Sequence, residues 1–343
     1  MAEHINIESF LSHSASFPVI DVRAPSEYLQ GHIPGALNIP LFSDHERKVV
    51  GTAYKQINKE AAMYAGLDFA GKKLVSLAKE GERLAGKKKT LLVHCWRGGM
   101  RSKSMVWLFE TMGISCYLLE GGYKSYRKYV REVLADPLNL LVIGGRTGSG
   151  KTAILHHLKK SGEQVIDLEG LAHHKGSAFG ALGEQDQPTT EQFENELCRE
   201  ISCLDAEQIT WIEDESRNVG KCVIPGELYS RMKETDMVFL DISRELRAKY
   251  LVGDYARYEQ EALRACVLKI QKRLGGDRTK EALEAVDRED YFQTAMITLH
   301  YYDKAYMYSL EKNHESYHVL TSSDVDPVKN AELLVKYEKE RRI

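Results

Sequence analysis

The sequence predicts an α/β protein with two successive parallel-sheet units. Short apolar runs alternate with helix-like stretches along its 343 residues, a pattern typical of strands joined by crossover helices. Two glycine-rich loops, at residues 94–102 and 145–152, each follow an apolar run and precede a helical stretch. Between them, Asp136-Pro137 interrupts the pattern, because a residue that precedes proline is disfavoured in a helix. We therefore predict domains at residues 1–136 and 137–343, each long enough for its own core.

In the first unit, four short apolar runs are predicted to form strands of one sheet. These runs are residues 17–21, 37–39, 90–93 and 115–119. Helical structure is expected at residues 25–29, 59–85, 102–111 and 123–134. The third strand leads directly into Cys95, so this side chain is expected at the carboxyl end of a buried strand.

The second unit repeats this alternation and then becomes mostly helical. Strands are predicted at residues 138–143, 164–168, 208–212, 237–240 and 317–320. Helices are predicted at residues 153–160, 190–203 and 328–339, with Thr189 or Thr190 capping the second of them. Because residues 244–310 are also expected to be mostly helical, this domain should carry a helical extension.

Composition and charge exclude several classes of protein. The net charge of −3 gives no global sign of nucleic-acid binding, so any RNA contact has to come from a local patch. Residues 1–9 are polar, unlike a secretion signal, and no apolar run approaches the length of a membrane span. The six cysteines form no Cys-x-x-Cys pair, and the spacing of Cys198 and Cys203 does not suit a metal. We expect reduced thiols and a cytoplasmic protein with no membrane partner.

The strongest chemical signal is the segment His-Cys-Trp-Arg-Gly-Gly-Met-Arg-Ser at residues 94–102. A cysteine at a strand end, two glycines and an arginine entering a helix predict a cup of backbone N–H groups around a thiol. Such a cup lowers a thiol pKa and binds anions, so Cys95 is a candidate nucleophile. The candidate anion-binding residues are Arg97, Gly98, Gly99 and Arg101. The alternative is a structural cysteine, which needs neither the glycines nor the arginine.

The second loop fits the phosphate-binding pattern G-x-x-x-x-G-K-[ST] without a mismatch. It lies between a predicted strand and a predicted helix, the context in which this pattern cradles phosphates. The candidate phosphate-binding residues are Gly145, Gly148, Gly150, Lys151 and Thr152. Lys151 is expected to reach the outer phosphates, and the hydroxyl of Thr152 to hold Mg²⁺.

A magnesium ion at this loop also needs a carboxylate at the end of a strand. Asp167 and Asp214 both follow apolar runs and are the two candidate metal ligands, although each is also a candidate helix N-cap. His173 and His174 lie in a polar, glycine-rich segment. Because adjacent histidines point in different directions, we interpret them as part of a mobile substrate-binding loop and not as joint metal ligands.

Basic residues gather along the helical extension. They are Arg244, Arg247, Lys249, Arg257, Lys269, Lys272, Arg273, Arg278 and Lys280. They could form a basic face that contacts RNA, although taken alone they are more typical of a solvated helix surface with interleaved acids. A second candidate for RNA contact is the segment 124–131.

The first unit resembles rhodanese-like domains over roughly residues 15–130. The resemblance is carried by Asp21-Val22-Arg23, Glu27-Tyr28, Gly31–Ala36, Asn38-Ile39-Pro40, the Cys95 loop and Glu120-Gly121-Gly122-Tyr123. It implies that Cys95 occupies the family's active-site position. We interpret Asp21, Arg23 and Glu27 as structural, because the turns of the domain need charged partners.

The length of the Cys95 loop distinguishes two reaction classes within this resemblance. Five residues separate Cys95 from Arg101, whereas typical sulfurtransferases of this fold have four. The longer loop resembles that of rhodanese-like phosphatases, so a phosphate-like group is the expected substrate. A phosphatase also needs an acid that protonates the leaving group, and the sequence shows no obvious one beside this loop.

The two units together resemble the tRNA 2-selenouridine synthase family over nearly the whole chain. Besides the two loops, the matching segments are 165–174, Gly176-Ser177-Ala178-Phe179-Gly180 and Glu213-Asp214-Glu215-Ser216-Arg217. The resemblance implies a rhodanese-like parallel-sheet domain followed by a P-loop NTPase-like α/β domain. It also implies an enzyme that replaces the sulfur of a wobble 2-thiouridine in tRNA with selenium from selenophosphate, through an S-geranyl intermediate made from geranyl diphosphate.

The resemblance implies that the two loops bind different substrates of the reaction. Cys95 and Arg101 would handle selenium and its phosphate, whereas the loop from Gly145 to Thr152 would hold the diphosphate. We expect no tightly bound cofactor, with Mg²⁺ accompanying the diphosphate. Two alternatives stay open at this point: a phosphatase or kinase that acts on a small phosphorylated molecule, and a non-catalytic, nucleotide-dependent tRNA-binding protein. The sequence does not predict an oligomeric state.

Overall fold

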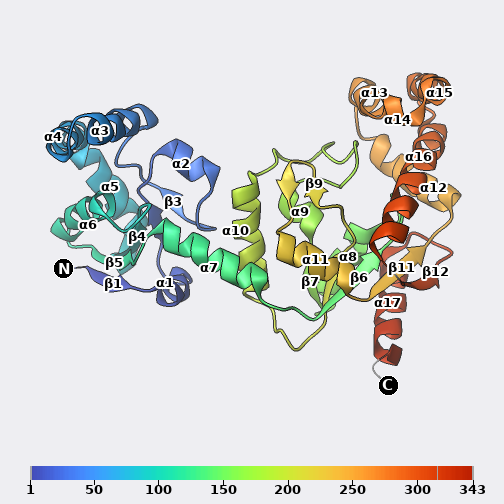
Figure 1. Cartoon of the computed structure of the whole chain (residues 1–343), viewed down its shortest axis with the longest axis horizontal. Helices are drawn as coiled ribbons and strands as arrows, with labels where there is room; N and C mark the ends of the chain where they lie inside the picture. Colours follow the sequence, from blue (N-terminus) through green and yellow to red (C-terminus); the bar gives the residue numbers. More distant parts are fainter. Residues whose placement is uncertain (1, 315, 342–343) are drawn as a thin grey trace. The chain divides into compact units, whose positions relative to one another are not determined.

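The computed structural model describes residues 2–314 and 316–341. The chain divides into two compact units, and the boundary between them falls between Val133 and Leu134 (Figure 1). Both units contain a parallel sheet with helices packed on it, so the predicted α/β fold class is confirmed. No helix in the described ranges is long and apolar enough to cross a membrane.

The first unit is built on a five-stranded parallel sheet with the order β1-β5-β4-β2-β3. Its strands are β1 (Glu3–Ile5), β2 (Val19–Asp21), β3 (Leu37–Asn38), β4 (Thr90–His94) and β5 (Ser115–Leu119). β4 lies in the middle, with Leu92 opposite Val19 on one side and Tyr117 on the other. The four predicted strands are present, whereas β1 was missed because its first two residues, Glu3 and His4, are polar and exposed, so it forms no apolar run.

The helices of this unit differ from the prediction between β3 and β4. They are α1 (Ile7–Ser14), α2 (Pro25–Gln30), α3 (Asp44–Gln56), α4 (Lys59–Gly71), α5 (Leu74–Ala85), α6 (Met100–Thr111) and α7 (Tyr123–Ala135). The single helix predicted at residues 59–85 is wrong, because the chain leaves the helix at Gly71 and restarts at Leu74. The prediction also missed α3, which Ser43 and Glu46 begin with a capping box.

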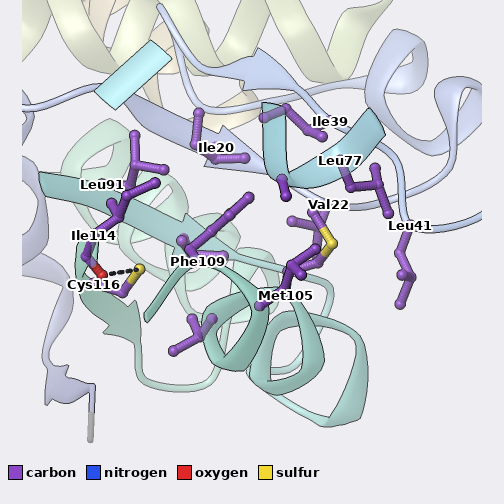
Figure 2. Close-up of a cluster of buried hydrophobic side chains, with 14 of the residues drawn as sticks. Ile20, Val22, Ile39, Leu41, Leu77, Leu91, Met105, Phe109, Ile114 and Cys116 are labelled. Atoms are coloured by element: carbon purple, nitrogen blue, oxygen red, sulfur yellow. Dashed lines mark hydrogen bonds between the residues drawn. The ribbon is translucent and has the colours of Figure 1, made fainter. Parts of the chain in front are cut away.

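The core of this unit lies between the sheet and helices α5 and α6 (Figure 2). Phe109 of α6 is fully buried there, and Gly81 of α5 is the residue it packs against. A Cβ atom at position 81 would lie 2.2 Å from the Phe109 ring, so only glycine permits this close approach. The packing fixes α6, the helix whose N-terminus follows the Cys95 loop.

The second unit has a five-stranded parallel sheet with the order β12-β11-β6-β8-β7. Its strands are β6 (Leu140–Gly144), β7 (Gln164–Ile166), β8 (Thr210–Glu213), β11 (Met237–Asp241) and β12 (His318–Thr321). A small antiparallel pair, β9 (Asn218–Val219) and β10 (Cys222–Val223), follows β8. All five predicted strands are therefore present, and the phosphate-binding loop leaves the central strand, β6.

The helices of the second unit include the predicted helical extension. They are α8 (Lys151–Lys160), α9 (Leu168–Ala172), α10 (Thr190–Ile201), α11 (Gly226–Glu234), α12 (Arg244–Tyr255), α13 (Gln260–Lys269), α14 (Gln271–Leu274), α15 (Gly276–Asp287), α16 (Tyr291–Asn313) and α17 (Pro327–Arg341). Thr189 caps α10 through its side chain, as one of the two predicted caps. Helices α12–α16 bury their own apolar cluster, which includes Leu263, Val267 and Leu299 (Figure 1).

Candidate active site: two anion-binding loops

The first loop begins where β4 ends, and the start of α7 holds it in place. Cys95 is only 3% exposed. Its carbonyl oxygen accepts a hydrogen bond from the Tyr123 N–H (2.8 Å), and the Trp96 carbonyl accepts one from the Lys124 N–H (3.0 Å). These two hydrogen bonds fix the backbone of the loop against the start of α7.

Two glycines make this backbone arrangement possible. Gly98 has a φ of +65°, and Gly122 of the neighbouring turn has a φ of +62°. A Cβ atom at position 122 would lie 2.4 Å from the Cys95 carbonyl oxygen and 2.5 Å from the Gly98 nitrogen. Glycine is thus required both for the conformation and for the close approach of the two backbones.

The electrostatics of the cup favour the thiolate of Cys95. Its sulfur lies 3.1 Å from the hydroxyl oxygen of Ser102, in the first turn of α6. Burial by itself raises the pKa of this thiol, but the Ser102 hydroxyl, two backbone N–H groups and the charge of Arg101 together lower the pKa below its ordinary value. By contrast, burial raises the pKa of Cys116, in the same core, to about 12. Cys95 therefore has the environment of a nucleophile, whereas Cys116 is a structural thiol.

Arg101 is held by a carboxylate that sequence reasoning assigned to a purely structural role. Its Nη1 donates to Glu27 Oε2 (2.6 Å) and its Nη2 to Glu27 Oε1 (3.3 Å). Burial raises the pKa of Glu27, but the hydrogen bond and charge of Arg101 outweigh this and lower it. Glu27 thus orients the guanidinium. No local pattern could indicate the pair, because 74 residues separate its members.

The other two charged residues of the N-terminal motif have the expected structural role. Arg23 and Asp21 form a buried ion pair (2.6 Å), and Arg23 also donates to the Gly31 carbonyl oxygen. The guanidinium lies 3.8 Å from the centre of the Tyr123 ring. These contacts hold in place the turn at Gly31 and the start of α7, which contacts the Cys95 loop.

The second loop has the backbone of a phosphate cradle. Gly148 and Gly150 have φ angles of +81° and +77°, and Gly150 is the N-cap of α8. Lys151 Nζ donates to the Gly145 carbonyl oxygen (2.9 Å), so its ammonium group lies across the loop. The Gly145 N–H donates to the Tyr306 hydroxyl (3.0 Å). The first residue of the loop is thereby anchored to α16.

The carboxylate that reaches Thr152 is Glu169, which the sequence analysis did not select. Thr152 Oγ1 donates to Glu169 Oε2 (2.5 Å), and Glu213 Oε1 accepts from the Glu169 N–H (2.9 Å). Burial and the charge of Glu169 raise the pKa of Glu215 to about 8, against the opposing charge of Lys151. Burial also raises the pKa values of Glu169 and Glu213. This acidic group therefore has more carboxylates than nearby cations.

The two predicted magnesium ligands have other partners. Asp167 caps α9 through the Gly170 N–H (2.8 Å) and bonds His156 (2.7 Å). Asp214 accepts from Lys233 (2.6 Å) and Tyr306 (2.8 Å). Burial works against ionisation of Asp214, but His314 and Lys233 lower its pKa to about 2. Asp214 is thus bound to a cation of the chain itself, and neither aspartate touches Thr152 as Glu169 does.

The histidine segment lies against the acidic group. A Cβ atom at Gly176 would lie 2.9 Å from Glu215 Oε1 and 3.0 Å from Glu169 Oε1. His173 has a left-handed backbone conformation, and its Nδ1 lies 3.0 Å from the Asp186 carbonyl oxygen. The buried Nδ1 of His174 has no partner among the described residues. The structure thus brings this segment to the phosphate-binding loop, near Thr152.

One residue of the predicted basic face, Arg247, lies inside the fold. Arg247 is 2% exposed and bonds Asp303 (2.8 Å) and the Thr147 carbonyl oxygen (2.9 Å), so the prediction that it faces solvent is wrong. Arg244 also bonds Asp303, and Arg273 donates to Tyr301. An ion pair with an acid inside the fold removes much of the charge that RNA could meet.

The side chains beside the phosphate-binding loop could hold a magnesium ion only if a phosphate ligand supplied further oxygen donors. Within residues 2–314 and 316–341, no group of three or more His, Cys, Asp or Glu side chains is arranged to hold a metal. Thr152 and Glu169 supply two oxygen donors, and Mg²⁺ commonly takes one or two protein oxygens together with phosphate oxygens and water. The loop is thus suited to a magnesium–phosphate pair and not to an ion alone.

Fold and site together define a two-domain enzyme, with a thiol-bearing rhodanese-like domain and a P-loop domain. The family model for the rhodanese-like domain matches residues 7–129, and the model described as the tRNA 2-selenouridine synthase AAA domain matches residues 138–334. The chain belongs to the tRNA 2-selenouridine synthase family.

Relatives from several bacteria match nearly the whole chain. The tRNA 2-selenouridine synthase of Bdellovibrio bacteriovorus is 35% identical over 87% of this chain and 90% of its own length. That of Nitrosomonas europaea is 32% identical with the same coverage. A solved structure, the N-terminal domain of a putative ATP/GTP binding protein from Clostridium difficile 630, is 39% identical and covers 37% of this chain and 98% of its own, with a TM-score of 0.35.

Proposed function

We propose that this enzyme converts wobble 2-thiouridine in tRNA to 2-selenouridine, with geranyl diphosphate and selenophosphate as co-substrates. In the first step, the base sulfur attacks the first carbon of geranyl diphosphate. A carbon–sulfur bond forms, the carbon–oxygen bond breaks, and diphosphate leaves with the electron pair. In the second step, selenium from selenophosphate replaces the geranylthiolate at the base, and water takes the phosphoryl group. We place this reaction in the cytoplasm.

The single observation that carries the proposal is the lowered pKa of Cys95 inside an anion-binding loop. A soft thiolate beside Arg101 suits selenophosphate, which combines a soft selenium with a phosphate group. Cys95 serves the second step as a nucleophile towards the geranylated base: its thiolate adds to C2 as geranylthiolate leaves with the electron pair. Selenide, freed from selenophosphate when water takes the phosphoryl group, then displaces the Cys95 thiolate. Arg101, oriented by Glu27, and the N–H groups of Arg97, Gly98 and Gly99 hold the phosphate.

The second loop serves the first step. Lys151 and the N–H groups between Gly145 and Thr152 hold the diphosphate of geranyl diphosphate, and Lys151 stabilises the charge that develops as it leaves. Thr152 and Glu169 would hold a magnesium ion, which supplies further charge stabilisation for the departing diphosphate. The loop that contains His173 and His174 is the proposed cover of this site.

Two observations weigh against the alternatives. A phosphatase needs a protonated acid near its cysteine, but Arg101 keeps the pKa of Glu27 low, so Glu27 is a poor proton donor. A non-catalytic tRNA-binding protein has no need for a thiol with a lowered pKa, whereas Cys95 has one.

The test uses the purified full-length chain with tRNA that carries 2-thiouridine, selenophosphate and geranyl diphosphate. Mass spectrometry of the tRNA nucleosides should detect 2-selenouridine with wild type and none with Cys95→Ser. Cys203→Ser is the matched control, because Cys203 is exposed and lies outside both loops. Normal 2-selenouridine from Cys95→Ser would remove this thiol from the mechanism, and full activity without geranyl diphosphate would remove the first step.

A further inference from the structure

A cavity of about 760 Å³ in the second unit has no role in the chemistry described above. It lies beyond the carboxyl ends of β11 and β12, with helices α12 and α16 as its other walls. Arg146, the second residue of the phosphate-binding loop, is part of its lining. The cavity therefore adjoins the loop without including Lys151 or Thr152.

The lining carries an excess of positive charge. Its charged members are Arg146, Arg244, Arg247, Lys304, Asp241 and Asp303. Four cations face two carboxylates, so the excess is two charges with His300 neutral. Partial burial lowers the pKa of His300, and the charges of Arg278, Arg244 and Lys304 lower it further. Both observations indicate a region that attracts anions.

The cations differ in how far they are already neutralised. Inside the cavity, Arg247 bonds both oxygens of Asp303 (2.8 and 3.0 Å), and Arg146 pairs with Asp241 (2.6 Å). Lys304 is exposed and makes no ion pair with any residue in the described ranges. His300 lies one turn before it on α16. The charge available to a ligand is therefore at the outer edge of the cavity.

We propose that this cavity binds the phosphodiester backbone of the tRNA substrate, with Lys304 as a phosphate contact and the exposed Ser323 as a hydroxyl donor. The inference rests on the proposed function, since that makes tRNA the substrate. Long basic side chains and small hydroxyls are the usual partners of backbone phosphates. A site for a small free anion would instead use its buried cations, and here those already have carboxylate partners.

Arg247 connects this surface with the diphosphate site. Its guanidinium contacts Asp303 in the cavity and the Thr147 carbonyl oxygen in the phosphate-binding loop. RNA bound at Lys304 would therefore lie close to the loop that holds the proposed geranyl donor. The proposed surface shares Arg244 and Arg247 with the predicted basic face and adds Lys304 of α16.

The experiment measures binding of a fluorescently labelled tRNA to the full-length chain across a salt series. Lys304→Ala should weaken binding several-fold and reduce the salt slope by about one unit, as expected for one lost phosphate contact. Lys304→Glu should weaken it further. Lys312→Ala is the matched control, because Lys312 is an exposed lysine on the same helix that does not line the cavity. Thermal unfolding should be unchanged in all three variants.

The outcomes separate this inference from the proposed function. Absence of tRNA binding by wild type would overturn the proposed function itself. Wild-type binding with equal slopes for Lys304→Ala and Lys312→Ala would overturn only the inference. A parallel titration with inorganic phosphate and inorganic diphosphate completes the test. If Lys304→Ala weakens binding of these anions and leaves tRNA binding intact, the cavity is a small-anion site and the RNA assignment is wrong.

Discussion

Both anion-binding loops leave a parallel strand and enter a helix, yet their surroundings differ in charge. Around Cys95, Arg101 and Arg47 both contact the carboxylate of Glu27, and the loop itself adds Arg97. Around Thr152, one lysine lies among the carboxylates of Glu169, Glu213 and Glu215.

This difference shows how the same backbone serves two kinds of ligand. The first loop can bind an anion directly, because the positive charge is already in place. The second loop would repel an anion unless a cation or protons enter with it, since its carboxylates are buried close together. In the proposed reaction, the first site would therefore take an isolated phosphate group, and the second a metal-bound diphosphate.

The largest expected effect comes from removing the single lysine of the second loop. Lys151→Ala should reduce geranylation of tRNA by about 10²-fold or more, because one charged donor at a developing charge is commonly worth that much. Alkylation of Cys95 should be unchanged, and tRNA geranylated beforehand should partly restore 2-selenouridine formation. Geranylation at the wild-type rate would mean that the loop serves another ligand, and ATP would then be tested.

The next largest effect concerns divalent cations. Chelation with EDTA should weaken binding of geranyl diphosphate by roughly tenfold, because the cation that offsets the charge of the acidic group is lost. Alkylation of Cys95 should not respond to EDTA. Titration calorimetry with and without Mg²⁺ checks this, with Glu169→Gln expected to reduce the dependence on Mg²⁺. Equal affinities with and without metal would contradict the proposed charge balance.

A smaller effect is expected from Ser102, whose hydroxyl lies 3.1 Å from the Cys95 sulfur. This hydrogen bond is the largest of the contributions that lower the pKa of Cys95 against burial, so Ser102→Ala should raise this pKa. The pH profile of iodoacetamide alkylation should shift to higher pH, and at any pH below the wild-type pKa the variant should react more slowly. Lys103→Ala on the exposed side of α6 is the control. An unshifted profile would show that the Ser102 hydroxyl does not stabilise the thiolate.

The smallest effect belongs to Arg101, whose charge also lowers the pKa of Cys95 but contributes less than the Ser102 hydrogen bond. Arg101→Ala should therefore raise this pKa by less than Ser102→Ala does. The same alkylation profile measures this shift. A larger shift for Arg101→Ala than for Ser102→Ala would reverse this ranking of hydrogen bonding and charge at the thiol.

Local patterns in the sequence predicted most elements and both loops. The strands were visible because each is a short apolar run, and the two loops because their glycines and cations are adjacent in the chain. The capping box of Ser43 and Glu46 was also readable and would have revealed α3. The break after Gly71 was hidden, because apolar residues continue on both sides of it.

Long-range partners were beyond sequence reasoning. Glu27 reaches Arg101, and Glu169 reaches Thr152, only because the folded sheets bring together the helices that follow separate strands. Asp214 has the pattern of a metal ligand but accepts a hydrogen bond from Lys233 of helix α11. Arg247 has the pattern of a surface cation, yet Asp303 neutralises it inside the fold.

The position of Cys116 has a consequence for oxidative damage. Cys116 pairs with Leu91 near the start of β4, whereas Cys95 follows its last residue. Four residues of strand separate them by about 13 Å, far beyond the reach of a disulfide. A sulfenic acid formed on Cys95 therefore finds no resolving thiol at Cys116, and its repair depends on a thiol from elsewhere. A low-pKa thiol without such protection is prone to irreversible overoxidation.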